Sequence, residues 1–297
     1  MEYVLRTKGL TKAYGQKTVV DKVSMNIAGG DIYGFIGKNG AGKTTTMKII
    51  LGTIFSDGGS IELFGKKANN NARRRIGALI EAPGIYKNLT AYENLRRFSL
   101  LYGGDEKNIK EILEIVDLSD TGNKKAGEFS LGMRQRLGIG IAMLGSPDFL
   151  ILDEPVNGLD LEAIKRVRDS LITINREKKV TILISSHLLG ELSKISTRYG
   201  IINNGRLVEE ITAQQLEKDC RRCLTVKCRR PNIAEKTLIS ALGINDFEIC
   251  NETIIIGSGF ERTEEINAEL VRKGAQVYDF HLSNADMEDY FIERIGR

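Results

Sequence analysis

Short apolar runs alternate with amphipathic stretches along the first two hundred residues, and glycine stands at many of the junctions. Runs rich in β-branched residues between turn signals predict strands, whereas longer stretches with apolar positions three and four apart predict helices. The expected strands lie at residues 4–7, 19–27, 31–36, 60–64, 149–152, 180–185 and 199–202. Strands that alternate with helices in this way are typical of an α/β domain.

Helices are expected directly after Gly42 and after Leu159. Three further helical patterns, at residues 91–102, 107–116 and 131–144, follow one another without an intervening strand. We expect them to form a helical subdomain, about residues 86–146, inserted ahead of the strand at 149–152. The α/β domain as a whole is expected to cover residues 1–211.

The pattern changes after the turn at residues 201–206, and a smaller domain is expected at residues 212–297. Its predicted strands lie at 224–228, 247–251, 253–256 and 276–280, and its predicted helices at 233–242, 264–273 and 285–295. This order predicts a small α+β domain. Its role stays open between a dimerisation or regulatory module and an inert cap.

Composition limits the classes of function. The chain has 297 residues, of which 41% are hydrophobic and 28% charged, as in ordinary globular domains. No stretch approaches the roughly 18 apolar residues of a membrane span, and no signal peptide is expected at the N-terminus. The net charge of +4 is mild, so no nucleic acid partner is expected.

The four cysteines, at positions 220, 223, 228 and 250, have a spacing that suggests a metal site. However, Cys223 and Cys228 are an odd number of residues apart in one predicted strand, so their side chains should point to opposite faces. We therefore expect reduced cytosolic thiols instead of a metal centre.

A glycine-rich loop after the predicted strand 31–36 matches G-x-x-x-x-G-K-[ST], and a helix is expected directly after it. Glycine lets successive backbone N–H groups face phosphate oxygens, and the helix N-terminus adds positive charge. Lys43 supplies a mobile cation, and the Thr44 hydroxyl can ligate Mg²⁺. The residues predicted to bind the nucleotide are Gly37, Asn39, Gly40, Ala41, Gly42, Lys43, Thr44 and Thr45.

Two adjacent carboxylates, Asp153 and Glu154, end the apolar run that begins at Phe149. The carboxyl ends of parallel strands are where open α/β sheets bind ligands. Asp153 fits Mg²⁺ through water, and Glu154 is placed to orient or deprotonate the attacking water. His187 follows another apolar strand at the same expected edge, which favours a contact with the γ-phosphate. The expected catalytic groups are thus Lys43, Glu154 and His187.

In this order the motifs resemble the ATPase subunit of ATP-binding cassette (ABC) transporters, over roughly residues 3–206. Residues 37–44 correspond to the Walker A loop of that family and residues 149–154 to its Walker B strand. The resemblance implies ATP and Mg²⁺ as cofactors and a stacking contact of Tyr14 with adenine. It also implies that residues 157–160, which end in Asp160, form the loop that signals between subunits, and that His187 is the switch histidine.

Two positions depart from the family pattern. The signature L-S-G-G-Q reads Phe129-Ser130-Leu131-Gly132-Met133, which keeps the hydroxyl and one glycine. Where the family normally carries glutamine, this chain has Glu81, which can still ligate Mg²⁺ but adds a negative charge beside the γ-phosphate. With these departures the chain resembles the branch that exports bacitracin-like peptides and lantibiotics.

The expected architecture is a P-loop NTPase cassette with an inserted helical subdomain and a small C-terminal α+β domain. The resemblance implies a second ABC subunit, identical or not, that closes head to tail around two Mg-ATP. Ser130, Gly132 and Met133 of one subunit would complete the site of the other. It also implies an integral membrane permease, which would hold this ATPase at the cytoplasmic face of the membrane.

Two other functions stay open at this point. The first is a soluble ABC ATPase that acts on ribosomes or DNA, although such proteins usually carry two cassettes or long coiled coils. The second is the ATPase of another small-molecule transporter, including an importer. The α+β pattern after residue 212 argues only mildly against an importer.

Overall fold

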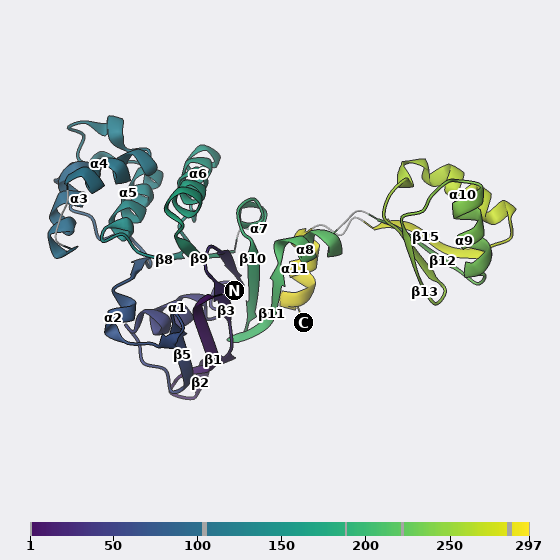
Figure 1. Cartoon of the computed structure of the whole chain (residues 1–297), viewed down its shortest axis with the longest axis horizontal. Helices are drawn as coiled ribbons and strands as arrows, with labels where there is room; N and C mark the ends of the chain where they lie inside the picture. Colours follow the sequence, from purple (N-terminus) through teal and green to yellow (C-terminus); the bar gives the residue numbers. More distant parts are fainter. Residues whose placement is uncertain (1, 103–105, 188, 221–222, 284–286, 297) are drawn as a thin grey trace. The chain divides into compact units, whose positions relative to one another are not determined.

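The computed structural model describes residues 2–102, 106–187, 189–220, 223–283 and 287–296. The chain forms two compact units, one made of Met1–Ala213 and Phe291–Arg297 and the other of Gln214–Tyr290 (Figure 1). The chain thus leaves the first unit after residue 213 and returns to it at residue 291. The sequence pattern predicts that all of residues 212–297 belong to the smaller domain. In the structure, the boundary between the two units falls within α11 (Met287–Gly296).

A mostly parallel sheet forms the centre of the first unit. Its strands are β4 (Ile32–Ile36), β7 (Ile76–Leu79), β8 (Phe149–Asp153), β9 (Thr181–Ser186), β10 (Arg198–Asn203) and β11 (Arg206–Thr212). Their order is β11-β10-β4-β9-β8-β7, and only the pairing of β10 with β11 is antiparallel. All residues of β4, β8 and β9 are buried, as expected of inner parallel strands. The α/β prediction is confirmed.

An antiparallel sheet, built on the long strand β1 (Tyr3–Tyr14), lies in the same unit. Its other strands are β2 (Lys17–Val23), β3 (Asn26–Ala28), β5 (Gly58–Leu63) and β6 (Lys66–Lys67). The prediction of one continuous strand at residues 19–27 was wrong. The strand is interrupted at Ser24 and Met25, and β2 pairs with the second half of β1 whereas β3 pairs with the first half.

Helices surround these sheets or form the inserted subdomain. Outside the insertion they are α1 (Lys43–Leu51), α2 (Asn70–Arg73), α6 (Leu161–Lys178), α7 (Leu189–Leu192) and, at the boundary of the units, α8 (Ala213–Asp219). The insertion contains α3 (Ala91–Ser99), η1 (Leu100–Tyr102), α4 (Glu106–Ile115), η2 (Ser119–Thr121), η3 (Ala126–Glu128) and α5 (Leu131–Met143), and Figure 1 shows α3, α4 and α5 together beyond the sheet. Gly140 of α5 packs between Leu95, Ile112 and Val116, where a Cβ would lie 3.1 Å from Ile112. Close packing therefore joins the three helices.

The second unit has the element order β12 (Cys223–Cys228), α9 (Pro231–Ser240), β13 (Phe247–Cys250), β14 (Thr253–Ile256), η4 (Phe260–Arg262), α10 (Thr263–Arg272) and β15 (Val277–Ser283). The antiparallel sheet runs β13-β14-β12-β15, the strand order of a ferredoxin-like βαββαβ unit. Leu224, Val226, Ile254 and Ile256 alternate along β12 and β14 and form a core with residues of α9 and α10. The predicted α+β class is confirmed.

The end of α11 packs on strand β10 of the first unit. Phe291 is 1% exposed, and its ring lies 5.9 Å from that of Tyr199 in an edge-on arrangement. Arg294 donates a hydrogen bond of 3.0 Å to Glu209 of β11. Burial raises the pKa of Tyr199 to about 12. The last helix thus completes the core at the β10–β11 edge.

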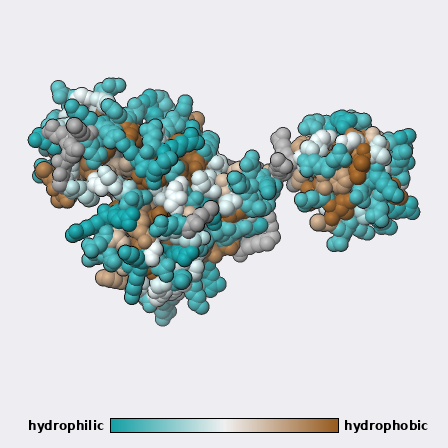
Figure 2. All heavy atoms as spheres, viewed as in Figure 1, coloured by the Kyte–Doolittle hydropathy of each residue, from teal (hydrophilic) through white to brown (hydrophobic). Residues whose placement is uncertain are grey.

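The surface is mixed in polarity. On the face shown in Figure 2, hydrophilic side chains cover most of each unit, and smaller apolar groups are visible between them. None of the described helices combines the length and apolar character needed to cross a lipid bilayer.

Candidate nucleotide-binding site

The glycine-rich loop joins the buried strand β4 to the N-terminus of α1, as the sequence predicted. Gly42 has φ +104°, and a Cβ there would lie 2.6 Å from the Val19 carbonyl oxygen, so only glycine fits. The loop encloses a cavity of about 150 Å³. The lining residues are Val19, Lys38, Asn39, Gly40, Ala41, Gly42, Lys43, Thr44, Thr45 and Glu154. Except for Gly37, the predicted loop residues therefore line one small cavity at a helix N-terminus, which suits a phosphate.

The Lys43 side chain is 5% exposed, and its ammonium lies inside this loop. It donates hydrogen bonds to the carbonyl oxygens of Gly37, at 2.6 Å, and Lys38, at 3.3 Å. It also lies 3.1 Å from Glu154 Oε1, an ion pair that lacks the alignment of a hydrogen bond. Two predicted catalytic groups, Lys43 and Glu154, are therefore in direct contact.

Asp153 is held at the end of β8 by two hydroxyl groups. Thr44 Oγ1 donates to one carboxylate oxygen at 2.7 Å, and Ser185 Oγ donates to the other at 2.6 Å. Ser185 also accepts a hydrogen bond of 2.9 Å from the Glu154 N–H. The oxygen atoms of Thr44 and Asp153 thus form a compact donor set of the kind that Mg²⁺ prefers. Sequence reasoning missed Ser185, whose signal was its place at the end of the neighbouring strand.

Glu154 and His187 meet across the ends of β8 and β9. Nδ1 of His187 lies 2.8 Å from Glu154 Oε2, and Glu154 adopts a left-handed backbone with φ +49°. A non-glycine residue in this conformation is strained, and such strain often occurs at functional sites. The carboxylate is thereby fixed between Lys43 and His187.

Glu81 lies in an ion pair with Lys48. The two side chains are 2.6 Å apart, and Glu81 has φ +62°. The hydrogen bond from Lys48 to Glu81 raises the pKa of Lys48. The Glu81 side chain is 67% exposed, and it does not line the loop cavity. Sequence reasoning missed Lys48, which lies one helical turn after Thr44 on α1.

Tyr14 ends β1 and is 51% exposed. The Lys12 ammonium lies 5.6 Å from the centre of its ring and 2.8 Å from Asp57. Tyr14 is not among the residues that line the loop cavity. About half of the Tyr14 surface is thus open to solvent, and the Lys12 ammonium lies over the ring.

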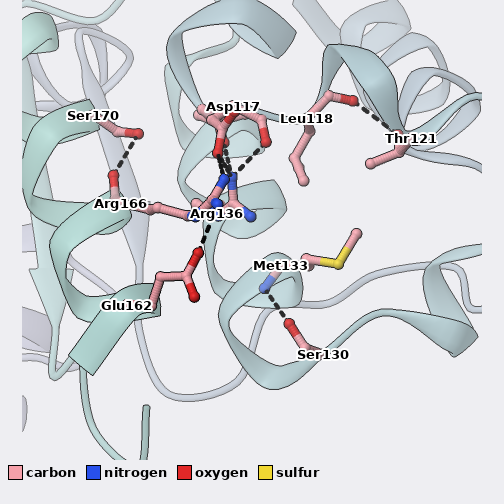
Figure 3. Close-up of polar contacts among 10 residues, drawn as sticks. Asp117, Leu118, Thr121, Ser130, Met133, Arg136, Glu162, Arg166 and Ser170 are labelled. Atoms are coloured by element: carbon pink, nitrogen blue, oxygen red, sulfur yellow. Dashed lines mark hydrogen bonds and ion pairs between the residues drawn. The ribbon is translucent and has the colours of Figure 1, made fainter. Parts of the chain in front are cut away.

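Ser130, Met133 and Asp160 line a second cavity, of about 420 Å³. Figure 3 shows Ser130 and Met133 among the polar contacts beside it. Ser130 caps α5 by accepting a hydrogen bond of 3.2 Å from the Met133 N–H. Asp160 caps α6 in the same way, at 2.8 Å from the Ala163 N–H. A Cβ on Gly132 would lie 2.6 Å from the Ala163 side chain, so glycine is required there. None of the residues that line this second cavity also lines the loop cavity around Lys43.

Comparison with known proteins identifies the family. Residues 20–157 match the family described as ABC transporter. The bacitracin transport ATP-binding protein BcrA of Enterococcus faecalis is 41% identical over 300 residues, covering 100% of this chain and 97% of that protein. The chain therefore belongs to the ATP-binding subunits of ABC transporters, in which ATP hydrolysis is coupled to transport.

Two further comparisons support this assignment. The lantibiotic transport ATP-binding protein SrtF of Streptococcus pyogenes is 41% identical over 207 residues, which are 70% of this chain and 90% of that protein. The crystal structure of the ADP conformation of the ATP-binding cassette MJ1267 superposes with a TM-score of 0.67 and 25% identity, over 74% of this chain and 95% of that one. The predicted family, P-loop cassette fold and ATPase class are confirmed. ABC ATPase subunits of transporters work with membrane permeases, so a permease partner follows from the family.

Proposed function

We propose that this chain is the ATPase subunit of an exporter that protects cells from antimicrobial peptides of the bacitracin or lantibiotic kind. The observation that carries the proposal is the match to the bacitracin transport protein, which covers 100% of this chain and so includes the ferredoxin-like unit. The match to the lantibiotic transport protein covers 70% of the chain. The permease would hold the chain at the cytoplasmic face of the membrane.

The loop residues Gly37 to Thr45 would bind the phosphates of ATP through their N–H groups and the Lys43 ammonium. Thr44 and Asp153 would hold Mg²⁺, which supplies charge neutralisation at the phosphates when bound. Tyr14 would stack on the adenine through its exposed ring. The residues from Lys38 to Thr45 already line the loop cavity, Asp153 is bonded to Thr44 beside it, and Tyr14 is exposed at the end of β1.

Glu154 would accept a proton from the attacking water, and His187 would orient its carboxylate and contact the γ-phosphate. The contact between Lys43 and Glu154 would make the availability of the Glu154 carboxylate depend on nucleotide binding. A phosphate in the loop competes with Glu154 for the same ammonium, because both are anionic. Nucleotide binding would therefore release Glu154 toward the water.

Ser130, Gly132, Met133 and Asp160 would act on the nucleotide of a second ABC subunit, either identical or different. Their separation from the loop cavity supports this, because no residue lines both cavities. Two subunits in head-to-tail contact would then form two composite sites. Charge-assisted hydrogen bonds to phosphate, each worth about 1.5–3 kcal/mol, would stabilise the closed pair until hydrolysis.

Replacing Glu81 with glutamine is expected to raise the Mg²⁺ concentration needed for half-maximal ATPase activity by roughly tenfold, because one carboxylate ligand is lost. Replacing Lys48 with methionine should lower that concentration, because it frees the Glu81 carboxylate from its ion pair. Mg²⁺ titrations of steady-state hydrolysis at fixed ATP measure both shifts. An identical Mg²⁺ requirement in the parent and Glu81→Gln proteins would remove Glu81 from the metal site.

Cells that lack this chain are expected to be inhibited by lower concentrations of bacitracin and lantibiotics, with no change for an unrelated small antibiotic. The parent gene should restore resistance, whereas a gene with Glu154→Gln should not, at equal protein abundance, since hydrolysis drives transport. Inhibitory concentrations across a panel of antibiotics provide the measurement. Unchanged susceptibility to all the peptides would contradict the proposed cargo and leave the ATPase assignment intact.

A further inference from the structure

Asp117 occupies a backbone position that normally favours glycine. Helix α4 ends in a Schellman turn, in which the Asp117 N–H donates to Glu114 at 3.1 Å and the Leu118 N–H donates to Leu113 at 2.9 Å. The turn requires a left-handed residue, and Asp117 has φ +53°. Glycine is the usual residue at this point of the turn, because a Cβ there is strained. Aspartate is one of the few residues besides glycine that adopt this conformation readily, so the turn presents a carboxylate at this point.

Arg136 of α5 makes several bonds to this turn. Its Nη1 donates to the Asp117 carboxylate at 2.7 Å, to the Val116 carbonyl at 3.0 Å and to the Asp117 carbonyl. The Arg136 side chain is 7% exposed, and its Nε has no hydrogen-bond partner among the residues that the structure describes. A buried guanidinium needs a counter-charge, and Asp117 supplies one beside the C-terminal carbonyl groups of α4.

Arg166 of α6 donates to the same carboxylate oxygen as Arg136 (Figure 3). Its Nη1 lies 2.6 Å from Asp117 Oδ2, and its Nη2 lies 2.7 Å from Glu162. Asp117 is therefore a bridge between α5 and α6, which are separated in the sequence by strand β8.

The two helices bridged by Asp117 begin at the two loops proposed to contact the partner's nucleotide. Their first turns are in close contact, because a Cβ on Gly132 would lie 2.6 Å from Ala163. Arg136 lies one turn beyond Gly132 on α5, and Arg166 lies one turn beyond Ala163 on α6. Close packing and the carboxylate bridge thus fix neighbouring turns of the same helix pair.

We propose that Asp117 is a positioning residue that holds α5 and α6 in register, so that Ser130 and Asp160 meet the partner's nucleotide together. The inference rests on the proposed action of these two caps at a second subunit. Without the carboxylate, the guanidinium groups of Arg136 and Arg166 would repel each other, because both carry positive charge and no anion would lie between them.

Two substitutions distinguish the effect of losing the carboxylate from an effect on folding. Asp117→Asn keeps the shape of the side chain, and Asp117→Gly removes it while relieving the left-handed backbone. Asp148→Asn is the matched control, because Asp148 is also 53% exposed and lies 2.7 Å from an arginine, Arg75, in another part of the unit. All three are made in the Glu154→Gln protein, so that ATP is bound but turned over slowly.

Both Asp117 variants should bind ATP as monomers with parental affinity. They should dimerise with ATP about tenfold more weakly, because caps that are out of register lose the equivalent of one charge-assisted bond to the partner's nucleotide. Asp148→Asn should match the parent in both measurements. Thermal melting should show Asp117→Gly at least as stable as Asp117→Asn, which separates lost positioning from lost folding. Parental dimer affinity in both Asp117 variants would overturn the inference.

Amide hydrogen exchange on the monomer tests the bridge without a dimer. The N–H groups of Met133 and Ala163, which bond only to the two caps, should exchange severalfold faster in Asp117→Asn than in Asp148→Asn. Unchanged exchange at both groups overturns the inference. If exchange is faster but the Glu154→Gln parent forms no ATP-dependent dimer, the bridge between the helices is supported and the proposed dimer fails.

Discussion

ATP affinity is expected to fall at least about a hundredfold when Lys43 is replaced by alanine. Lys43 is the lysine that the G-x-x-x-x-G-K-[ST] motif specifies, and it lines the cavity with its ammonium already bonded to the carbonyl groups of Gly37 and Lys38. Removing it deletes charge-assisted bonds to phosphate and leaves only the N–H groups of the loop. Equilibrium titration with fluorescent ATP measures the loss.

The control for this substitution is Lys66→Ala, which removes an exposed lysine of β6 and should leave ATP affinity unchanged. Lys43→Ala also takes away the ion-pair partner of Glu154, so a thermal melt must show that the protein is folded before the titration is interpreted. Parental affinity in folded Lys43→Ala protein would contradict the phosphate role of the loop lysine.

Replacing Glu154 with glutamine is expected to slow ATP hydrolysis by roughly 10²–10⁴-fold while ATP binding is retained. The amide keeps the shape of the carboxylate but cannot accept the proton of water. It also ends the ion pair with Lys43, which leaves that ammonium free for phosphate. The ATP-loaded dimer should therefore accumulate, and light scattering with bound-nucleotide counting should find two ATP per dimer.

Two further variants make this result specific. Glu177→Gln, at an exposed position near the end of α6, should hydrolyse ATP at the parental rate. Adding Ser130→Arg to Glu154→Gln should prevent the dimer but preserve ATP binding by the monomer, because an arginine side chain would fill the contact made by the Ser130 hydroxyl. Parental hydrolysis in Glu154→Gln would exclude Glu154 as the base, and a dimer that tolerates Ser130→Arg would exclude the head-to-tail arrangement.

The loop and acidic parts of the site could be predicted because each part is continuous in the sequence. Gly37 to Thr45 connect a buried strand to a helix, so the glycine content of this segment and its place between the two elements both predict a phosphate-binding loop. Asp153 and Glu154 directly follow four apolar residues of β8. Parallel pairing of β4, β9 and β8 then brings their carboxyl ends to one edge, a geometric rule that places His187 near Glu154.

Contacts between distant loops could not be predicted in this way. Lys48 is one of many lysines, and its ion pair with Glu81 depends on a left-handed backbone that no local pattern encodes. Ser185 looked like the last residue of a strand, although its hydroxyl bonds Asp153. Strand β7 is four residues long and follows three arginines, so its apolar signal was too short to be recognised.

The path of the chain end was also beyond local reasoning. Residues 285–295 have the apolar spacing of a helix, and α11 was found at Met287–Gly296. An amphipathic pattern predicts that the apolar face of such a helix packs on another apolar surface, but it does not identify that surface. Phe291 meets Tyr199, which precedes it by the whole of the ferredoxin-like unit.

This return of the chain sets the order in which the protein can finish folding on the ribosome. Strand β10, with Tyr199, emerges long before Phe291, and the intervening unit must be translated first. At roughly 5–20 residues per second, the nascent cassette spends several seconds with one edge of its core uncovered. The cassette, whose translation begins first, therefore completes its core only after the whole ferredoxin-like unit has been translated.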